Sequence, residues 1–297
     1  MVDTPEWFVR ALAAPRSSHT VEVLGCAIHY LRWGQPGKAG LVLVHGGAAH
    51  AEWWSFLAPF LTRHCDVVAL DLSGHGESGW RDAYPRRTWA DEIRGVIADA
   101  RFVGQPILVG HSMGGLVSIV AASVFGDELA GAVIVDAPVR RPDPESQEGT
   151  VGTSFKNPKT YATAEDAIVR FRLVPDQPCA NAFIVEHVAR ASIRAVANGF
   201  TWKFDPRVFI KFSREKMSDY LANVRCRVAM LRGERSVVVR PETGEYMYEL
   251  LGRQAPLVEI PEAHHHLILD QPLAFIAALR ALLADWEHSV PRVPPAA

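Results

Sequence analysis

The sequence predicts an α/β fold with a mostly parallel, doubly wound sheet. Short apolar runs, typical of strands buried on both faces, alternate with segments of helical periodicity. The strand-like runs cover residues 41–44, 67–72, 107–109 and 132–135, and helical patterns lie between them at 51–61, 88–103 and 116–122. This alternation indicates a parallel sheet with helices on both faces. Reactive side chains are then expected beyond the carboxyl ends of the strands, where His45, Asp71, Ser112 and Asp136 stand.

Two further strand-like runs precede this pattern, at residues 21–24 and 27–33. The pair Gly25-Cys26 between them is a turn signal, so the two runs are expected to form a hairpin. The helix expected over residues 88–103 has Thr88 at its predicted N-cap. Asp91, three positions later, completes a weak capping box.

After residue 136 this rhythm breaks. Residues 140–159 are rich in Pro, Gly, Ser and charge, which is typical of a loop. Helical patterns follow at 164–171, where Thr163 opens the helix, and at 181–197, and an aromatic-rich stretch covers 199–210. We therefore expect residues 137–223 to form a mostly helical insertion.

The sheet is expected to resume at residues 227–231 and 256–260. Helices are predicted over 241–251 and over 272–286, the second with Asp270 as its cap. The sequence thus predicts one core domain made of residues 1–136 and 224–297, interrupted by the insertion. The Pro-rich end, residues 290–297, is expected to be disordered.

Composition narrows the range of partners. The chain has 297 residues and a net charge of −2, and it contains no dense Lys/Arg run, so nothing favours nucleic acid or an anionic membrane. The four cysteines lack C-x-x-C spacing and are expected to be free thiols of a reducing compartment; they are Cys26, Cys65, Cys179 and Cys226. No signal peptide or stretch of about 20 apolar residues is found, so a cytoplasmic location is predicted. The oligomeric state stays open between monomer and homodimer.

One motif stands at a strand-to-helix junction. Residues 110–114 read Gly110-His111-Ser112-Met113-Gly114, between an apolar strand and a helical pattern. A serine on such a sharp turn is lifted clear of the sheet, and the glycines allow strand and helix to approach closely. The backbone N–H of Met113 would then help to bind an oxyanion. The alternative is a Gly-rich turn whose serine caps the following helix.

Four motifs in this order resemble those of the α/β-hydrolase fold superfamily. They are His45-Gly46-Gly47, the turn from Asp71 to Ser78 with Gly74-His75-Gly76, the G-x-S-x-G run around Ser112, and His265 shortly before Asp270-x-Pro272. The resemblance covers roughly residues 20–136 and 224–287. It implies an α/β-hydrolase fold in which residues 137–223 form the helical cap.

The resemblance implies that Ser112 is a nucleophile, which needs an adjacent base because a serine hydroxyl is weakly nucleophilic at neutral pH. His264, His265 and His266 are candidates, and the spacing to Asp270 and Pro272 in the family assigns the base to His265. A metal site is not expected, since three consecutive histidines cannot all face one ion. No cofactor is expected either.

The acid of the triad departs from the usual pattern. Most members of the superfamily carry it in a Gly-x-x-Asp turn, which here reads Gly233-Glu234-Arg235-Ser236. A serine cannot balance an imidazolium. A subset of haloalkane dehalogenases instead carries the acid after the strand that follows the nucleophile strand, which implies Asp136. Glu234, or neither residue, remains the alternative. Asp71 and Asp270 resemble structural positions, the first in a turn and the second at a helix cap.

The resemblance also assigns the second oxyanion-hole N–H to Gly47, beside that of Met113. His45, His75 and His111 are expected to be structural. A serine nucleophile points to acyl transfer, so we expect hydrolysis of a small-molecule carboxylic ester through an acyl-enzyme. A C–C bond hydrolase of the meta-cleavage type would use the same machinery. A catalytically silent protein that binds a small molecule is the third hypothesis.

Overall fold

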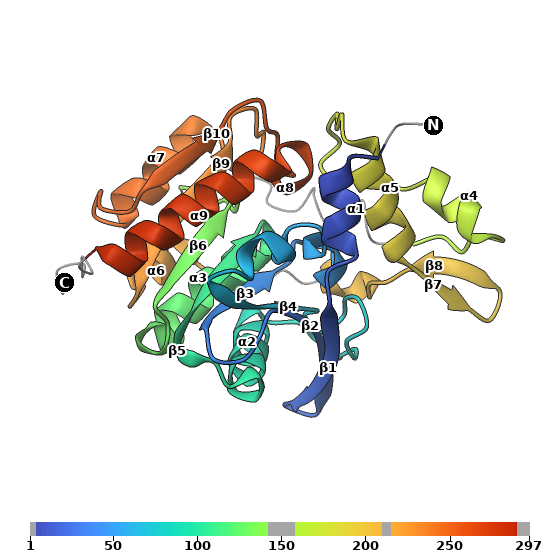
Figure 1. Cartoon of the computed structure of the whole chain (residues 1–297), viewed down its shortest axis with the longest axis horizontal. Coiled ribbons are helices and arrows are strands. Elements are labelled where there is room, and N and C mark those ends of the chain that lie inside the picture. The colour runs from blue at the N-terminus through green and yellow to red at the C-terminus, as the bar shows by residue number, and fades with distance from the viewer. Residues whose placement is uncertain (1–3, 142–157, 210–214, 290–297) are drawn as a thin grey trace.

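The computed structural model describes residues 4–141, 158–209 and 215–289 (Figure 1). Eight strands form one sheet in the order β1-β2-β4-β3-β5-β6-β9-β10, and β7 pairs with β8 in a separate hairpin. The pairs β1–β2 and β2–β4 are antiparallel, and every other pair in the large sheet is parallel. The strands are β1 Arg16–Val23, β2 Cys26–Trp33, β3 Ala39–Val44, β4 Cys65–Leu70, β5 Val103–His111, β6 Gly131–Val135, β7 Ile193–Val196, β8 Gly199–Trp202, β9 Arg227–Gly233 and β10 Leu257–Ile260.

Helices cover both faces of the sheet, as the sequence predicts. The α-helices are α1 Glu6–Leu12, α2 Arg86–Ala100, α3 Met113–Phe125, α4 Ala164–Val169, α5 Ala182–Ala191, α6 Met217–Ala222, α7 Pro241–Leu250, α8 Leu267–Asp270 and α9 Pro272–His288. Short 3₁₀ helices are η1 Ala51–Trp54, η2 Ala58–Leu61, η3 Gly126–Glu128 and η5 Pro206–Phe209. The predicted doubly wound α/β fold is therefore confirmed.

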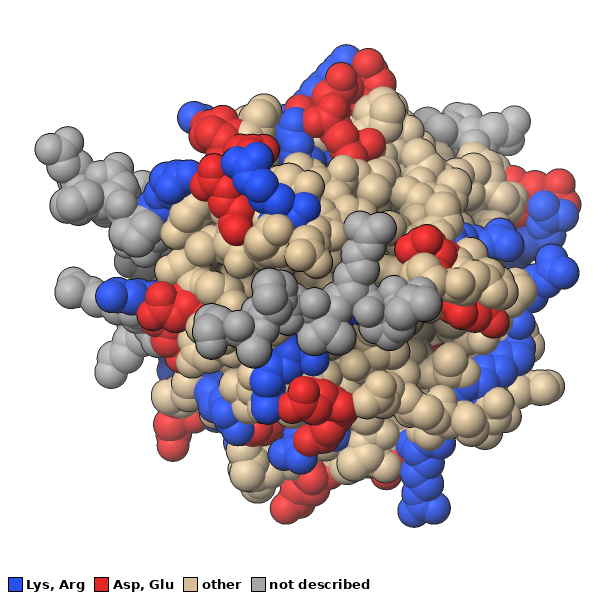
Figure 2. Space-filling view, turned by 90° about the vertical axis from the view of Figure 1, so that its left-hand side faces the viewer, with Lys and Arg blue, Asp and Glu red and all other residues tan. Residues whose placement is uncertain are grey.

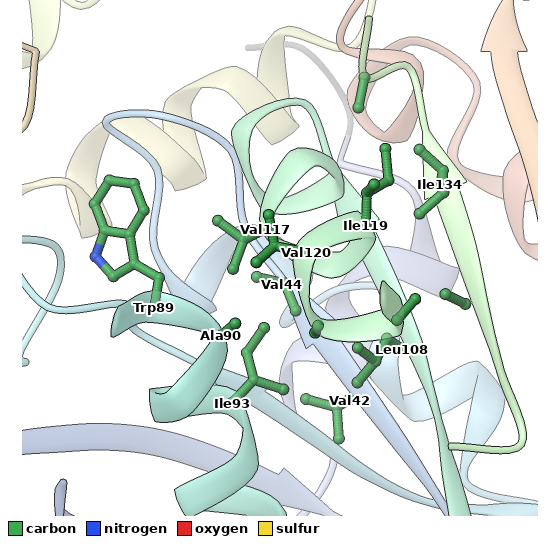
Figure 3. Close-up of a cluster of buried hydrophobic side chains, with 14 of the residues drawn as sticks. Val42, Val44, Trp89, Ala90, Ile93, Leu108, Val117, Ile119, Val120 and Ile134 are labelled. Carbon is green, nitrogen blue, oxygen red and sulfur yellow. The ribbon is translucent and has the colours of Figure 1, made fainter. Parts of the chain in front are cut away.

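The core has two layers, one on each face of the sheet. On one face, side chains of β3 and β5 meet those of α2 and α3, among them Val44, Leu108, Ile93 and Val120 (Figure 3). On the other face, α8, α9 and the 3₁₀ helices η1 and η2 pack against Leu41 and its neighbours. Each fully buried aliphatic or aromatic side chain stabilises the fold by about 1.5–3 kcal/mol relative to exposure. The strands that carry the site are thus held rigidly.

Two helix predictions are wrong in detail. The expected helix over residues 51–61 is two 3₁₀ turns, η1 and η2, because Pro59 lacks the N–H that a continuous helix needs. Helix α2 begins at Arg86, with Pro85 at its N-cap and no side-chain cap. Thr88 therefore lies within the first turn of α2 and the predicted capping box does not form. Pro85 itself has the extended backbone of an N-cap residue, with φ −68° and ψ 143°.

The segment around residues 181–202 also differs from prediction. Helix α5 ends at Ala191, and the hairpin β7–β8 takes the place of its expected last turns. The two strands are joined by Ala197 and Asn198, and Gly199, the first residue of β8, has a positive φ of 131°. The Asn198-Gly199 pair is a hairpin signal that is present in the sequence. Thr163, by contrast, caps α4 as expected, accepting a hydrogen bond from the N–H of Asp166 at 3.1 Å.

Residues 158–209 are joined by polar contacts to the segments that follow β3 and β4. His50 Nε2 lies 2.8 Å from Ser192 Oγ, and Ser55 Oγ lies 2.8 Å from His187 Nε2. The N–H of Gly76 donates to the carbonyl of Lys203 at 2.8 Å. The division into core and cap stays a prediction, and part of the expected loop 140–159 and all of 290–297 lie outside the described residues.

The surface carries mixed charge. On the face that Figure 2 displays, Lys and Arg are interspersed with Asp and Glu rather than gathered into a patch of one sign. Within the described part of the chain, no helix combines the length and apolar character needed to cross a membrane. The cytoplasmic location and the partners inferred from composition stay predictions.

Candidate active site

Ser112 stands on the turn between β5 and α3. Its backbone has φ 53° and ψ −120°, a left-handed conformation that is strained for a residue with a side chain. Its N–H donates to the carbonyl of Val135 on the neighbouring strand at 2.8 Å, which ties the turn to the sheet. The predicted elbow is therefore present, and Ser112 has no side-chain cap bond to the helix.

The glycines around Ser112 are required by close backbone contacts. A Cβ on Gly110 would lie 2.4 Å from the carbonyl oxygen of Gly114, and a Cβ on Gly114 would lie 2.4 Å from that of His45. Real Cβ atoms do not approach backbone atoms so closely, and the backbone of a packed sheet cannot move aside. The two glycines of the G-x-S-x-G motif are therefore needed because β3, β5 and α3 meet at this point.

His265 links Ser112 to a carboxylate. Its Nε2 lies 3.0 Å from Ser112 Oγ, and its Nδ1 lies 2.7 Å from Asp136 Oδ2. Because a carboxylate only accepts, Nδ1 carries the proton and donates to Asp136, which leaves the Nε2 lone pair facing the hydroxyl of Ser112. Both His265 and Asp136 are buried. The structure therefore brings together the three residues that the sequence analysis singled out.

Asp136 directly follows β6 and accepts three hydrogen bonds. Besides the bond from His265, its Oδ1 accepts from the N–H of Gly233 at 3.0 Å, and its Oδ2 accepts from the hydroxyl of Ser236 at 2.6 Å. These donors satisfy a carboxylate that water cannot reach. Sequence reasoning assigned no role to Ser236. Its place in the turn where the superfamily usually has the acid was the available signal.

The alternative acid lies elsewhere. Glu234 is exposed, and its carboxylate accepts from the N–H of Glu262 at 2.7 Å. His264 Nδ1 lies 3.4 Å from Asp270, outside the hydrogen-bond chain of Ser112. Asp270 is not the cap of α9, whose N-cap is Gln271 without a side-chain bond. Instead the Asp270 carboxylate accepts from the N–H of His264 at 2.8 Å, which orders the histidine loop.

The loop after β3 lies beside Ser112. A Cβ on Gly46 would lie 3.3 Å from Ser112 Cβ, and a Cβ on Gly47 would lie 3.8 Å from the sulfur of Met113. Met113 is the first residue of α3, where backbone N–H groups lack intrahelical partners and the helix dipole is positive. The two residues expected to form an oxyanion hole are therefore neighbours at this site.

His45 holds this loop in place. Its Nδ1 donates to the carbonyl of Gly46 at 2.7 Å, and its Nε2 accepts from the N–H of Leu72 at 3.0 Å. Burial lowers the pKa of His45, so the ring is neutral as these bonds require. The hydrogen bonds agree with the structural role expected of His45.

Asp71 has the structural role that the sequence analysis expected. It accepts from His29 Nδ1 at 2.7 Å and from the backbone N–H groups of Ala51 at 2.6 Å and Glu77 at 2.9 Å. Burial disfavours its charged form, but the hydrogen bonds and nearby histidines outweigh this and lower the pKa of Asp71 to about 2. Asp71 therefore stays ionised and holds the turn from Asp71 to Ser78 in place.

Three histidines gather at the site, although not the three consecutive ones. The side-chain nitrogens of His111, His265 and His266 lie within 4.8 Å of one another, and this is the group among the described residues that could offer nitrogens to a metal ion. Tetrahedral zinc with bonds of about 2.0–2.1 Å would need them about 3.4 Å apart. A metal here would also take the Nε2 lone pair that His265 turns to Ser112.

The flanking histidines are neutral. His111 Nε2 donates to the carbonyl of His265 at 2.9 Å, and His266 Nε2 donates to that of Val174 at 3.2 Å. Burial lowers the pKa of His111 to about 3, helped by the nearby His265, and lowers the pKa of His266 in the same direction. Neither ring faces Ser112 Oγ with a hydrogen bond, so only His265 pairs with the serine among the described residues.

A groove of about 1630 Å³ lies at the opposite end of the sheet. It is lined by residues at the amino ends of strands, such as Ala39, Gln105 and Arg227, together with the last turns of α9. Ser112, His265 and Asp136 lie at the carboxyl ends and do not line it. The groove is therefore not part of this site.

The chain is similar to known hydrolases over most of its length. The sequence model described as "Alpha/beta hydrolase family" matches residues 41–279. Lipase LipV of Mycobacterium tuberculosis is 27% identical over 280 aligned residues, covering 90% of this chain and 93% of the lipase. N-formylmaleamate deformylase of Pseudomonas putida is 29% identical over 273 aligned residues, covering 87% of this chain and 93% of the deformylase.

A solved structure shares the fold. E-2-(acetamidomethylene)succinate hydrolase superposes with a TM-score of 0.76 at 21% sequence identity, covering 91% of this chain and 100% of that structure. The resemblance seen in the sequence motifs is thus confirmed by the family match, by related hydrolases and by the fold. The protein belongs to the alpha/beta hydrolase family and is a hydrolase of that fold.

Proposed function

We propose that this protein hydrolyses carboxylic esters through an acyl-enzyme formed on Ser112. His265 acts as general base and Asp136 as the acid that orients and balances it. The N–H groups of Gly47 and Met113 form the oxyanion hole. The observation that carries the proposal is the unbroken chain of hydrogen bonds from Ser112 Oγ through His265 to Asp136, with lengths of 3.0 and 2.7 Å.

Acylation follows from this geometry. As Ser112 Oγ attacks the ester carbonyl, its proton passes to Nε2 of His265, and the new imidazolium is stabilised by the Asp136 carboxylate. The carbonyl oxygen becomes negative and is stabilised by the two N–H groups and by the amino end of α3. His265 then donates its Nε2 proton to the leaving alcohol, so the alcohol departs neutral and Ser112 carries the acyl group.

Deacylation repeats the same steps with water. His265 Nε2 removes a proton from a water molecule, which attacks the acyl carbon and forms a second oxyanion in the same place. Collapse of this intermediate breaks the bond to Ser112 Oγ, which takes back the proton from His265. The products are a carboxylic acid and a regenerated hydroxyl.

Aromatic side chains beside the site support an apolar substrate. Phe209 lies against Gly47, since a Cβ on that glycine would be 3.1 Å from the Phe209 ring. Trp53 lies with its ring centroid 5.6 Å from that of His266 and 6.3 Å from that of Phe171. These contacts support the proposal that the acyl or alkoxy group beside Ser112 is uncharged and apolar.

The proposal is tested with short-chain aryl esters and the variant S112A. We expect the wild type to hydrolyse them and S112A to lose at least ~10³-fold in kcat. S118A is the matched control, because Ser118 is a buried serine on the same helix whose hydroxyl donates to the carbonyl of Gly114. Turnover in S112A equal to that of S118A would contradict the proposal.

The same experiment separates the two alternatives. A C–C bond hydrolase would cleave a vinylogous diketone with the same dependence on Ser112 while leaving aryl esters largely untouched. A silent binding protein would turn over neither substrate and would not be labelled at Ser112 by a fluorophosphonate. The ester reading is preferred because a serine nucleophile with two oxyanion donors is the machinery of acyl transfer.

A further inference from the structure

Ser236 occupies the turn after β9, where the superfamily usually places its acid, and its hydroxyl is buried against Asp136. Ser236 Oγ lies 2.6 Å from Asp136 Oδ2. The same oxygen of Ser236 accepts from the N–H groups of Val238 at 3.1 Å and Val239 at 3.2 Å. The Ser236 hydroxyl, in the place where most of the superfamily has a carboxylate, therefore makes three hydrogen bonds.

These contacts allow the Ser236 hydroxyl proton to point only toward Asp136. Two backbone N–H groups occupy the lone pairs of Ser236 Oγ, so its O–H has to donate, and Asp136 Oδ2 is the acceptor within reach. The orientation of the hydroxyl is thus fixed by the backbone of its own turn. A hydrogen bond from a pre-oriented donor to a charged oxygen is stronger than one between neutral groups.

The two oxygens of Asp136 are consequently held by different parts of the β9 turn. Gly233 donates its N–H to Oδ1 at 3.0 Å, and Ser236 donates to Oδ2. A carboxylate held at both oxygens cannot rotate about its Cβ–Cγ bond without losing a hydrogen bond. Oδ2 is therefore kept in front of His265 Nδ1, 2.7 Å away.

We infer that Ser236 is a positioning residue for the hydrolysis proposed above: its hydroxyl fixes the rotation of the Asp136 carboxylate toward His265. Ser236 touches neither Ser112 nor His265 with a hydrogen bond and acts through Asp136. The inference rests on the proposed function for its kinetic consequence, but the hydrogen-bond chain that it describes can be observed without a substrate.

Removal of the hydroxyl has two effects. In S236A the carboxylate gains rotational freedom, so kcat falls by about three- to thirtyfold while KM changes little. Oδ2 also loses a competing donor and becomes a better acceptor for the imidazolium. The acidic limb of the pH dependence of kcat/KM therefore moves to higher pH, a change that general loss of folded protein would not produce.

The test compares S236A with S236T, which keeps a hydroxyl, and with E234Q. Glu234 lies in the same turn but outside the hydrogen-bond chain from Ser112 to Asp136. We measure kcat, KM and the pH dependence of kcat/KM for each variant. We also record the low-field proton NMR resonance of the His265 Nδ1–H, which is identified by its loss in H265Q. We expect S236A alone to lower kcat, move the acidic limb and shift or broaden the resonance. S236T and E234Q should match the wild type.

Two results would overturn the inference. The first is an S236A protein with the resonance, kcat and pH limb of the wild type. The second is equal impairment of S236A and S236T with an unmoved resonance, which would make Ser236 merely a packing residue. If the wild type hydrolyses no ester, the proposed function fails, and the resonance in S236A still decides the role of Ser236.

Discussion

Asp136 lies next to Ser112 in the register of the sheet, on the neighbouring strand. His111 of β5 pairs with Val135 of β6, and the next residue of each strand leaves the sheet with a positive φ, 53° at Ser112 and 47° at Asp136. The N–H of Ser112 donates to the carbonyl of Val135 at 2.8 Å. Ser112 and Asp136 are therefore positioned by two paired strands, whereas His265 comes from a distant loop.

The first prediction concerns the identity of the acid. D136N should keep the fold but lower kcat by roughly 10⁴-fold, because an amide favours the wrong imidazole tautomer and cannot balance the imidazolium. E234Q should retain nearly full activity, because Glu234 is exposed and bonds to the N–H of Glu262. Steady-state kinetics of both variants decide the point, and a large loss in E234Q alone would transfer the role.

The second prediction moves the acid. A carboxylate at position 236 would project from the turn toward the oxygen that now contacts His265 Nδ1, since Ser236 Oγ and that nitrogen share Asp136 Oδ2 as a neighbour. The double variant D136N/S236D should therefore recover at least ~10-fold in kcat relative to D136N. A double variant no faster than D136N would show that the β9 turn cannot present an acid to His265.

The sequence could predict those parts of the site that steric rules fix. The need for Gly110 and Gly114 could be predicted, because a Cβ at either position would collide with backbone. Each predicted strand of the parallel sheet is present, because continuous apolar runs are typical of strands buried on both faces. Strand β5 is much longer than predicted: it covers Val103–His111, whereas the sequence predicts a strand over residues 107–109 and a helix up to residue 103. The resemblance assigns Ser112 and His265 and, with Glu234 as an alternative, Asp136, and the structure brings Ser112, His265 and Asp136 together.

The rest depends on tertiary contacts. The sequence shows Ser236 in the place of the usual acid, but it does not show that the Ser236 hydroxyl bonds to Asp136, because the two residues are 100 positions apart. The end of α5 was misplaced because its helical periodicity outweighed the Asn198-Gly199 turn signal. Thr88 was assigned as a cap because propensity alone cannot distinguish it from Pro85 three residues earlier. These are competitions between local signals that packing decides.

The third prediction contrasts two glycines. G114A should lower the free energy of unfolding by at least ~2 kcal/mol and abolish activity, because the new Cβ would lie 2.4 Å from the carbonyl oxygen of His45. G244A should raise stability by about 0.5–1 kcal/mol, because Gly244 lies within α7 and its Cβ would meet Leu257 at an ordinary 3.4 Å. Urea unfolding measures both. Equal stability of the two variants would contradict the packing described around Ser112.

The fourth prediction concerns acid stability. Burial lowers the pKa of His50 to about 4, and burial together with nearby His45 lowers the pKa of His75 to about 3. Burial likewise lowers the pKa of His111 to about 3. Below pH ~6.5 these histidines bind protons in the unfolded chain but stay neutral in the folded protein. The free energy of unfolding is therefore highest above that pH and falls as the pH drops toward 4.

Each such histidine adds a slope of up to ~1.4 kcal/mol per pH unit to the free energy of unfolding. Urea unfolding between pH 7.5 and 5 should therefore show a steep fall in the free energy of unfolding. In H75Q the slope of this free energy against pH should be shallower, because about one proton fewer is bound on unfolding. His75 is the suitable site, because its Nε2 is buried without a hydrogen-bond partner. A slope unchanged in H75Q would mean that this ring is charged in the folded protein.

Mass spectrometry can detect an acyl group bound to Ser112. The protein is mixed with a short-chain aryl ester, quenched in acid within the first turnovers and digested, and the peptide that contains Ser112 is examined. We predict that this peptide carries the acyl group in the wild type, and that S112A carries none and is inactive. Ester turnover without an adduct on Ser112, persisting in S112A, would contradict the account.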